Sequence, residues 1–118
     1  MKLSKRTGLG TLECVGGETF NCGGLTPAKL ANKPIPWTYP ADSTIDPMSP
    51  GGKKADYKNV DGVSMPYSVL WLGRHGVFFH EWRSLPGIEG CIHLLEGDAK
   101  KFYDWANEKI RIVFEWTE

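Results

Sequence analysis

The second half of the chain carries the clearest alternation of apolar and polar residues. Residues 67–72 and 77–80 predict two strands of a hairpin, with residues 73–76 as the turn between them. A short apolar run at 91–95 predicts a third strand or the turn into one. Apolar residues at every second position over 110–116 predict a half-buried final strand.

One helix is predicted in the same half. Ala99, Phe102, Tyr103 and Ala106 follow i, i+3, i+4, i+7 spacing, which gives a helix one apolar stripe. Asp98 precedes them and suits an N-cap or first-turn position, where a negative charge is favourable against the helix dipole. The pattern therefore predicts a mostly β fold with one α-helix in its C-terminal half.

A glycine pair marks a second hairpin near the N-terminus. Two β-prone runs within residues 11–22 flank Gly16–Gly17, which predicts a type I′ turn with positive φ at both glycines. In that register Cys14 lies opposite Thr19 and falls on the other face of the hairpin from Cys22. A disulfide between these two cysteines is therefore disfavoured, unless a bulge shifts the register.

The stretch between the two halves is irregular. Six of the eight prolines lie between Pro27 and Pro50, and proline cannot donate a hydrogen bond in a helix interior or a central strand. Residues 26–64 therefore predict a long arm that wraps the core, with short edge strands at most.

Length and charge narrow the class of protein. The chain has 118 residues, which predicts a single domain over 1–118 with one modest core. Fourteen Lys and Arg balance fourteen Asp and Glu, so the chain lacks the basic surplus of a nucleic-acid binder. No apolar run approaches the ~20 residues of a membrane span. The basic start at 1–6 is followed by polar and glycine residues, so no signal peptide is predicted.

Gly90 and Cys91 are the first candidates for chemistry. A cysteine after a glycine can sit in a tight turn with its thiol presented, because glycine lets the backbone bend. His80 ends a predicted strand eleven residues upstream, and a nearby imidazole can lower a thiol pKa to give a thiolate–imidazolium pair. The alternative is a buried structural cysteine. Alternation places His93 on the same face as Cys91, either as a second catalytic imidazole or as a partly buried strand residue.

Other polar and aromatic residues carry weaker signals. His75 lies in the predicted turn and is expected to be exposed, and Glu81 either orients His80 or faces solvent. Trp82 is the one tryptophan expected near the site. Cys91-x-His93 has a poor spacing for chelation, so we expect no metal and no cofactor.

Several motifs occur in a familiar order. The order runs Met65-Pro66-Tyr67, Gly76–His80, Glu89–Leu94, Asp98-Ala99 with Tyr103, and Ile110–Val113. This order resembles the L,D-transpeptidase catalytic domain over residues 65–116. The segment Pro34-Ile35-Pro36 looks like one in the short branch of that family used as secreted antibacterial toxins. The resemblance implies a β-sandwich or barrel-like fold with one helix in the C-terminal half and a long Pro-rich loop.

The resemblance also implies roles for matching residues. Cys91 takes the position of the nucleophile and His80 that of the general base, while Gly90 and the Cys91 amide would contribute to an oxyanion hole. Substrate contacts are expected at His93, Glu89 and Trp82.

The sequence departs from the family pattern near the cysteine. Ile88 stands where the family has serine, and His93 stands where it has arginine. Glu81 follows the histidine where the family usually has a small residue, and the loop from His80 to Cys91 is shorter than usual. These differences keep a non-catalytic module open as an alternative.

The implied function is cysteine-dependent acyl transfer on peptidoglycan stem peptides, by attack at the carbonyl of the third residue with release or exchange of D-alanine. One alternative is an L,D-carboxypeptidase or endopeptidase acting as a secreted antibacterial toxin or lysis factor. Another is a wall- or protein-binding module on the same fold, and a third is a thiol redox or metal protein. We expect a monomer acting in the periplasm or cell wall, with an immunity or secretion partner. Delivery would be by a secretion apparatus, by phage lysis or after removal of a leader.

Overall fold

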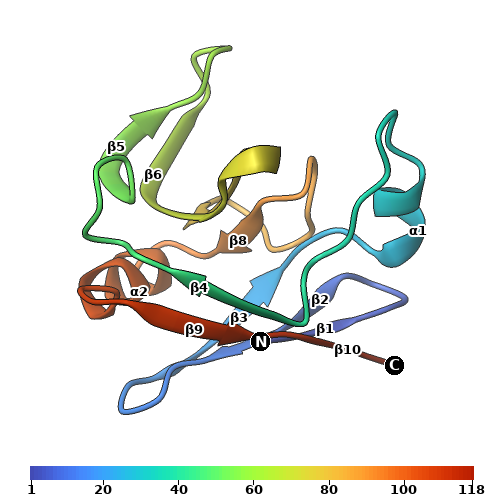
Figure 1. The fold of residues 1–118 in the computed structure, drawn as a ribbon, viewed down its shortest axis with the longest axis horizontal. Helices are drawn as coiled ribbons and strands as arrows, with labels where there is room; N and C mark the ends of the chain where they lie inside the picture. The colour runs from blue at the N-terminus through green and yellow to red at the C-terminus, as the bar shows by residue number, and fades with distance from the viewer.

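The computed structural model describes all residues 1–118 and contains ten strands, two α-helices and one 3-10 turn (Figure 1). The strands are β1 (Lys2–Ser4), β2 (Leu9–Glu13), β3 (Thr19–Gly23), β4 (Asp42–Ile45), β5 (Lys53–Lys58), β6 (Ser64–Leu72), β7 (Val77–Glu81), β8 (Ile92–Leu94), β9 (Ile110–Val113) and β10 (Glu115–Thr117). The helices are α1 (Pro27–Ala31) and α2 (Asp98–Trp105), and the 3-10 turn is η1 (Gly73–His75). No helix has the length and apolar content needed to cross a membrane.

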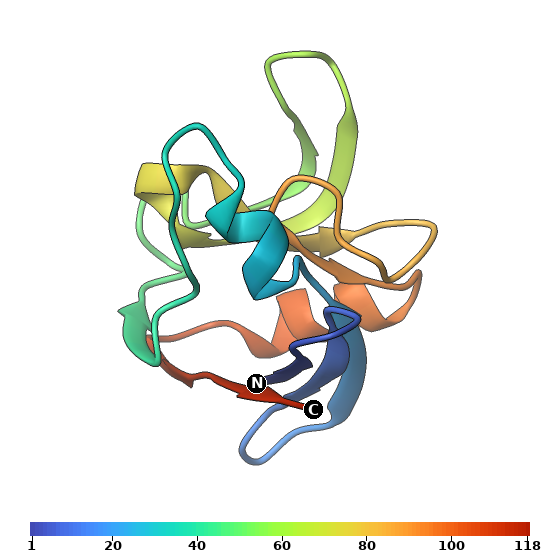
Figure 2. The ribbon, with the colours of Figure 1, turned by 90° about the vertical axis from the view of Figure 1, so that its right-hand side faces the viewer.

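Eight strands form one sheet in the order β10-β1-β2-β3-β8-β7-β6-β5, and β4 pairs with β9 in a second, two-stranded sheet. Two pairings are parallel, β1 with β10 and β7 with β8, while the other strand pairs are antiparallel. The hairpin of β5 and β6 extends beyond the rest of the molecule (Figures 1 and 2). The prediction of a mostly β fold is confirmed.

The core lies on one face of the large sheet, where α2 packs against β6 and β7. Phe79 of β7 and Ile92 of β8 are fully buried, because alternate side chains of both strands point inward. Phe102 of α2 packs its ring 5.0 Å from that of Phe79, measured between ring centroids. Burying an aromatic ring stabilises the fold by about 1.5–3 kcal/mol, so these contacts fix β7 and β8 against the helix.

The elements predicted for the second half of the chain are confirmed, except that the last predicted strand is split into two. The turn after β6 is a 3-10 turn that ends at Gly76, where φ is 64°. The strand predicted over 110–116 is two strands, because the backbone N–H of Phe114 leaves the ladder and donates to Ala41. The first part then pairs with β4 and the second with β1.

The arm at 26–64 is more ordered than its sequence suggests. The edge strand β5 and the short strand β4 agree with the prediction, but α1 was not predicted. Its first turn is capped by the Thr26 hydroxyl, which accepts a hydrogen bond from the Lys29 amide at 3.3 Å, and Pro27 suits the first helical position. A helix of five residues is too short to show a periodic apolar stripe.

The register predicted for the N-terminal hairpin is wrong by one residue. Leu12 pairs with Phe20, and the Gly17 amide donates to the Cys14 carbonyl, so the turn begins at Cys14. Only Gly16 has positive φ, at 73°, which suits the third position of a type II turn. The turn is therefore one residue longer than the expected type I′ turn.

The shifted register also corrects the placement of the cysteines. Cys14 and Cys22 lie on the same face of the hairpin, and both are buried in the core. They remain free thiols because they sit at different levels, Cys14 opposite Glu18 and Cys22 opposite Gly10. Four residues of strand separate the two levels, about 13 Å, whereas a disulfide needs Cα atoms about 4.4–6.8 Å apart.

Oxidation of the folded protein tests this register. Burial raises the pKa of Cys14 to about 11 and that of Cys22 to about 12, so both thiols stay protonated. We expect no intramolecular disulfide after treatment with diamide, and alkylation of all three cysteines once the protein is unfolded. Intact mass and peptide mapping provide the measurement. A linked peptide containing Cys14 and Cys22 would contradict the register.

Candidate active site

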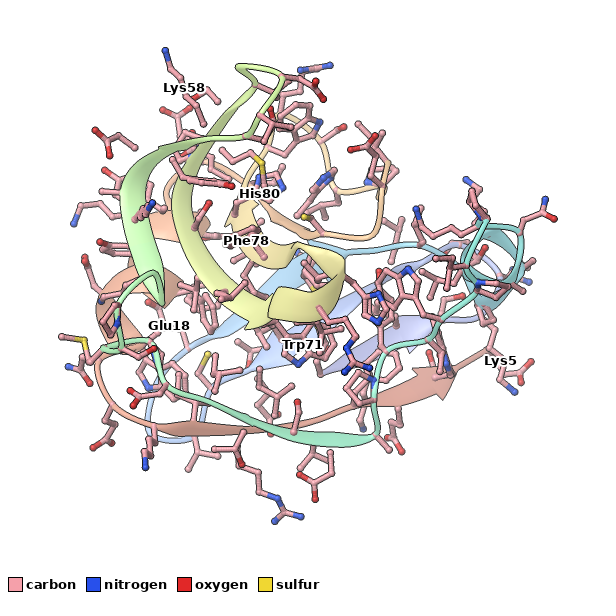
Figure 3. The ribbon with its side chains drawn as sticks, turned by 45° about the horizontal axis from the view of Figure 1, so that its top comes forward. Lys5, Glu18, Lys58, Trp71, Phe78 and His80 are labelled. Carbon is pink, nitrogen blue, oxygen red and sulfur yellow. The ribbon has the colours of Figure 1, made fainter.

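The candidate residues lie on the face of β7 and β8 that points away from the core. Phe79 pairs with Ile92 and His80 pairs with His93 in the parallel register. Because alternate side chains point to opposite faces, His80 and His93 lie together on the face opposite Phe79 and Ile92. Cys91 directly precedes β8. Figure 3 shows His80 beyond Phe78 on β7, beside the hairpin of β5 and β6.

His80 is oriented by the backbone of its neighbour. Its Nδ1 lies 2.8 Å from the carbonyl oxygen of Glu81, so a protonated Nδ1 donates there and leaves Nε2 as an acceptor. Burial lowers the pKa of His80 to about 4, with the nearby His93 acting in the same direction. The imidazole is therefore neutral at neutral pH and can accept a proton. The Glu81 backbone, rather than its carboxylate, provides the orientation.

Cys91 is half-buried and hydrogen-bonds the backbone at the start of β7. The Phe78 amide donates to Sγ at 3.4 Å, and the thiol donates to the Gly76 carbonyl at 3.5 Å. Burial raises the pKa of the thiol, although the bond from Phe78 lowers it. The expectation that His80 lowers this pKa is wrong for the resting site, because desolvation penalises both charged forms.

The parallel register explains why the thiol lies away from the imidazole. Parallel strands need a crossing connection, and the loop at 82–91 returns the chain to the start of β7. Cys91 therefore stands level with Phe78, two residues before the level of His80. By strand geometry the two Cα positions are about 8 Å apart, two residues along the strand direction and one strand across.

His93 carries an unpaired polar atom. The residue is only 3% exposed, and its Nδ1 has no hydrogen-bond partner. Its ring lies 5.0 Å from the ring of His80 and stacks at 5.5 Å on that of Trp82. Burial lowers the pKa of His93 as well. The backbone of Ser84 and Pro86 in the crossing loop acts in the opposite direction through hydrogen bonds to the ring.

Gly90 is held in a conformation that suits only glycine. Its φ is 120°, and a Cβ atom there would meet the Trp37 ring at 2.8 Å. The amides of Gly90 and Cys91 donate no hydrogen bond to another protein group. Two free N–H groups beside a thiol are the arrangement that stabilises an oxyanion.

Trp82 and Glu89, also predicted as site residues, lie on the crossing loop. The Trp82 ring stands edge-on to His80 at 5.8 Å, and the Arg83 guanidinium lies 4.7 Å above it. Glu89 is exposed, and its charge contributes to raising the pKa of Cys91. A pocket of about 300 Å³ opens beside Trp82, lined by Ser64, Pro66, Glu81, Trp82, Arg83 and Glu96. Of these residues, Trp82 is the one whose ring contacts both histidines, and the lining of the pocket includes neither histidine.

Two aromatic residues of the arm were missed by the sequence analysis. The Tyr39 hydroxyl donates to the Gly90 carbonyl at 2.8 Å, and Trp37 stacks on His75 with ring centroids 4.6 Å apart. His75 is exposed, as predicted. The sequence does show an aromatic pair inside an otherwise polar, proline-rich segment. No pattern of neighbouring residues, however, predicts that this pair contacts Gly90.

A larger pocket lies elsewhere. It measures about 850 Å³ and is lined from β2, β9 and α2, reaching Phe79 from the core side of the sheet. None of its lining residues is a histidine, and its one cysteine is Cys14. The candidate residues His80, Cys91 and His93 therefore lie outside this larger pocket.

No three His, Cys, Asp or Glu side chains are grouped so that they could hold a metal ion. Comparison of the chain with models of known protein families, with curated protein sequences and with solved structures finds no match.

The burial of His80 predicts a pH dependence of stability. The unfolded chain takes up a proton near pH 6.5, but folded His80 does so only near pH 4, so the unfolding free energy falls as pH drops through this window. His80 should contribute about 3 kcal/mol to that fall. Urea denaturation across this range measures it. His80→Asn should flatten the curve and the exposed His75→Asn should not; equal curves would disprove the assignment.

Proposed function

We propose that this protein is a cysteine acyl-transfer enzyme acting on peptidoglycan stem peptides. The proposal rests on one observation above all. Cys91 directly precedes β8, which pairs with the strand that carries the neutral, oriented imidazole of His80, and two unpaired backbone amides lie beside the thiol. The order of motifs from Met65 to Ile110 supports the L,D-transpeptidase type of reaction.

The chemistry follows from these positions. Sγ of Cys91 attacks the carbonyl carbon of the third stem residue, and Nε2 of His80 accepts the thiol proton. The Glu81 carbonyl, which holds Nδ1–H, stabilises the imidazolium that forms. The tetrahedral oxyanion accepts hydrogen bonds from the Gly90 and Cys91 amides. When it collapses, the C–N bond breaks and His80 returns the proton to the departing D-alanine.

The thioester on Cys91 then passes to an acceptor. An amine gives a cross-link or D-amino-acid exchange, and water gives L,D-carboxypeptidase or endopeptidase activity. Hydrolysis of the thioester would be the activity expected of a secreted antibacterial toxin or lysis factor. In either case the substrate places the site of action at the periplasm or cell wall.

The first step of the reaction starts from a neutral thiol and a neutral imidazole. Because burial lowers the pKa of His80 and raises that of Cys91, no ion pair is formed in advance. The thiol must leave Gly76 and turn toward His80, and proton transfer then accompanies the attack. His93 supports this step by packing its ring against His80, with ring centroids 5.0 Å apart.

The pocket beside Trp82 supports a zwitterionic substrate. Arg83 provides a positive charge there, and Glu81 and Glu96 provide negative charges. The third stem residue is a diamino acid, whose far end can carry both an ammonium and a carboxylate. We propose that this end lies in the pocket while its reacting carbonyl faces Cys91.

A non-catalytic wall-binding module is the second candidate. The hydrogen bonds of the Cys91 thiol to Gly76 and Phe78, rather than to His80, favour it. Ile88, where the family has serine, is exposed and offers no hydroxyl. Such a module would bind muropeptides without changing them.

Muropeptides distinguish the two candidates. We expect the wild type to release D-alanine from tetrapeptide stems, detected by mass spectrometry, and Cys91→Ala to release none. His80→Asn should reduce the rate by about 10²–10⁴-fold, the usual contribution of a general base. His75→Asn is the matched control and should keep the wild-type rate. Binding without turnover, together with no carbapenem adduct on Cys91, would refute the enzyme and favour the module.

The neutral state of His80 also predicts how the reaction rate depends on pH. His80 must be unprotonated to accept the thiol proton, so the rate should fall at acid pH with a midpoint near 4 and stay level toward neutrality. Initial rates of D-alanine release between acid and neutral pH measure this limb. A midpoint close to 6.5 would mean that His80 titrates as an exposed histidine does.

A further inference from the structure

Tyr39 bonds the peptide group that joins Gly90 to Cys91. Its hydroxyl donates to the Gly90 carbonyl at 2.8 Å, although the two residues are 51 positions apart in the chain. The Leu25 amide donates to the same hydroxyl oxygen at 3.0 Å. Because that amide already uses the oxygen as an acceptor, the hydroxyl proton is directed toward Gly90.

The bonded carbonyl and the Cys91 amide belong to one planar unit. A trans peptide holds its C=O and N–H in opposite directions, so fixing the Gly90 carbonyl also fixes the Cys91 N–H. A hydrogen bond to the carbonyl polarises the group and makes its N–H a better donor. This N–H makes no hydrogen bond within the protein. Tyr39 therefore controls the direction of a free donor beside the thiol.

Tyr39 is itself held in place from several sides. It is 3% exposed, and its ring stacks on Trp71 at 5.3 Å and meets Phe114 edge-on at 5.4 Å. Burial raises the pKa of the phenol, which keeps the hydroxyl protonated as a donor. Trp37 contacts the Tyr39 ring at 5.4 Å and fills the space in which Gly90 would otherwise turn.

We propose that Tyr39 is a positioning residue that aims the Cys91 amide at the oxyanion formed when Cys91 is acylated. This inference rests on the proposed acyl transfer at Cys91, but it does not depend on the peptidoglycan substrate. It predicts that losing the hydroxyl slows reactions that pass through an oxyanion and leaves other reactions of the same thiol unchanged.

Two reagents separate these classes of reaction. p-Nitrophenyl acetate acylates a thiol: the S–C bond forms, the carbonyl oxygen carries the negative charge, and p-nitrophenolate then leaves while His80 takes the thiol proton. Iodoacetamide alkylates a thiol by direct displacement of iodide, and no oxyanion forms. Rates at Cys91 are followed by peptide mapping, because the thiols of Cys14 and Cys22 are buried.

We expect Tyr39→Phe, which keeps the ring, to lower the acylation rate of Cys91 by about 10-fold or more, toward the 10²–10³-fold loss of an oxyanion donor. The alkylation rate should stay within about twofold of wild type, since no oxyanion is involved. Tyr103→Phe is the control, because that ring packs on Tyr67 away from Gly90, and it should change neither rate. A merely structural role for Tyr39 would move both reactions together or neither.

The other possible results of this experiment each contradict a specific part of the proposal. Equal acylation in wild type and Tyr39→Phe overturns the role of Tyr39 and leaves the proposed function standing. Absence of acylation in the wild type overturns both. Acylation that depends on Tyr39, with no action on muropeptides, supports Tyr39 and overturns only the substrate.

A second variant tests the proposal if Tyr39→Phe does not fold. If Tyr39→Phe unfolds, 4-aminophenylalanine at position 39 keeps the ring and a weaker N–H donor. Its acylation rate should then fall below the wild-type rate while alkylation is unchanged. An unchanged acylation rate in that variant overturns the proposal.

Discussion

The parallel pairing of β7 with β8 is the constraint on which the rest of this structure depends. Its register places Phe79 and Ile92 in the core and, by the alternation of strands, His80 and His93 on the opposite face. A slip of one residue would send an imidazole into the core and a phenylalanine ring out of it. The packing energy of the aromatic core therefore also fixes the geometry of the candidate site.

The same pairing sets the electrostatics of that site. The crossing loop and the neighbouring strands bury His80, His93 and Cys91 together, and desolvation favours the neutral form of each group. The resting site therefore holds a thiol and imidazoles without charge, and one histidine nitrogen lacks a partner.

The irregular arm contributes as much to this site as the sheet does. Tyr39 and Trp37 reach across from the arm and fix the Gly90 peptide on two sides. The arm continues into β4, which pairs with β9, so it is anchored on the far side of the core as well. A segment without regular structure can thus be rigid when its aromatic residues are buried.

Local patterns in the sequence determined β6, β7, the final strands and α2, because alternation and helical spacing arise from neighbouring residues such as Ala99 and Phe102. They also predicted that His80, Cys91 and His93 belong to one candidate site. Only the tertiary structure decided the hairpin register, in which Leu12, Cys14, Phe20 and Cys22 are all buried on one face. The levels of Cys91 and His80, their neutral state and the contact from Tyr39 were likewise decided by packing. These depend on desolvation and on groups far apart in the chain, which no local pattern records.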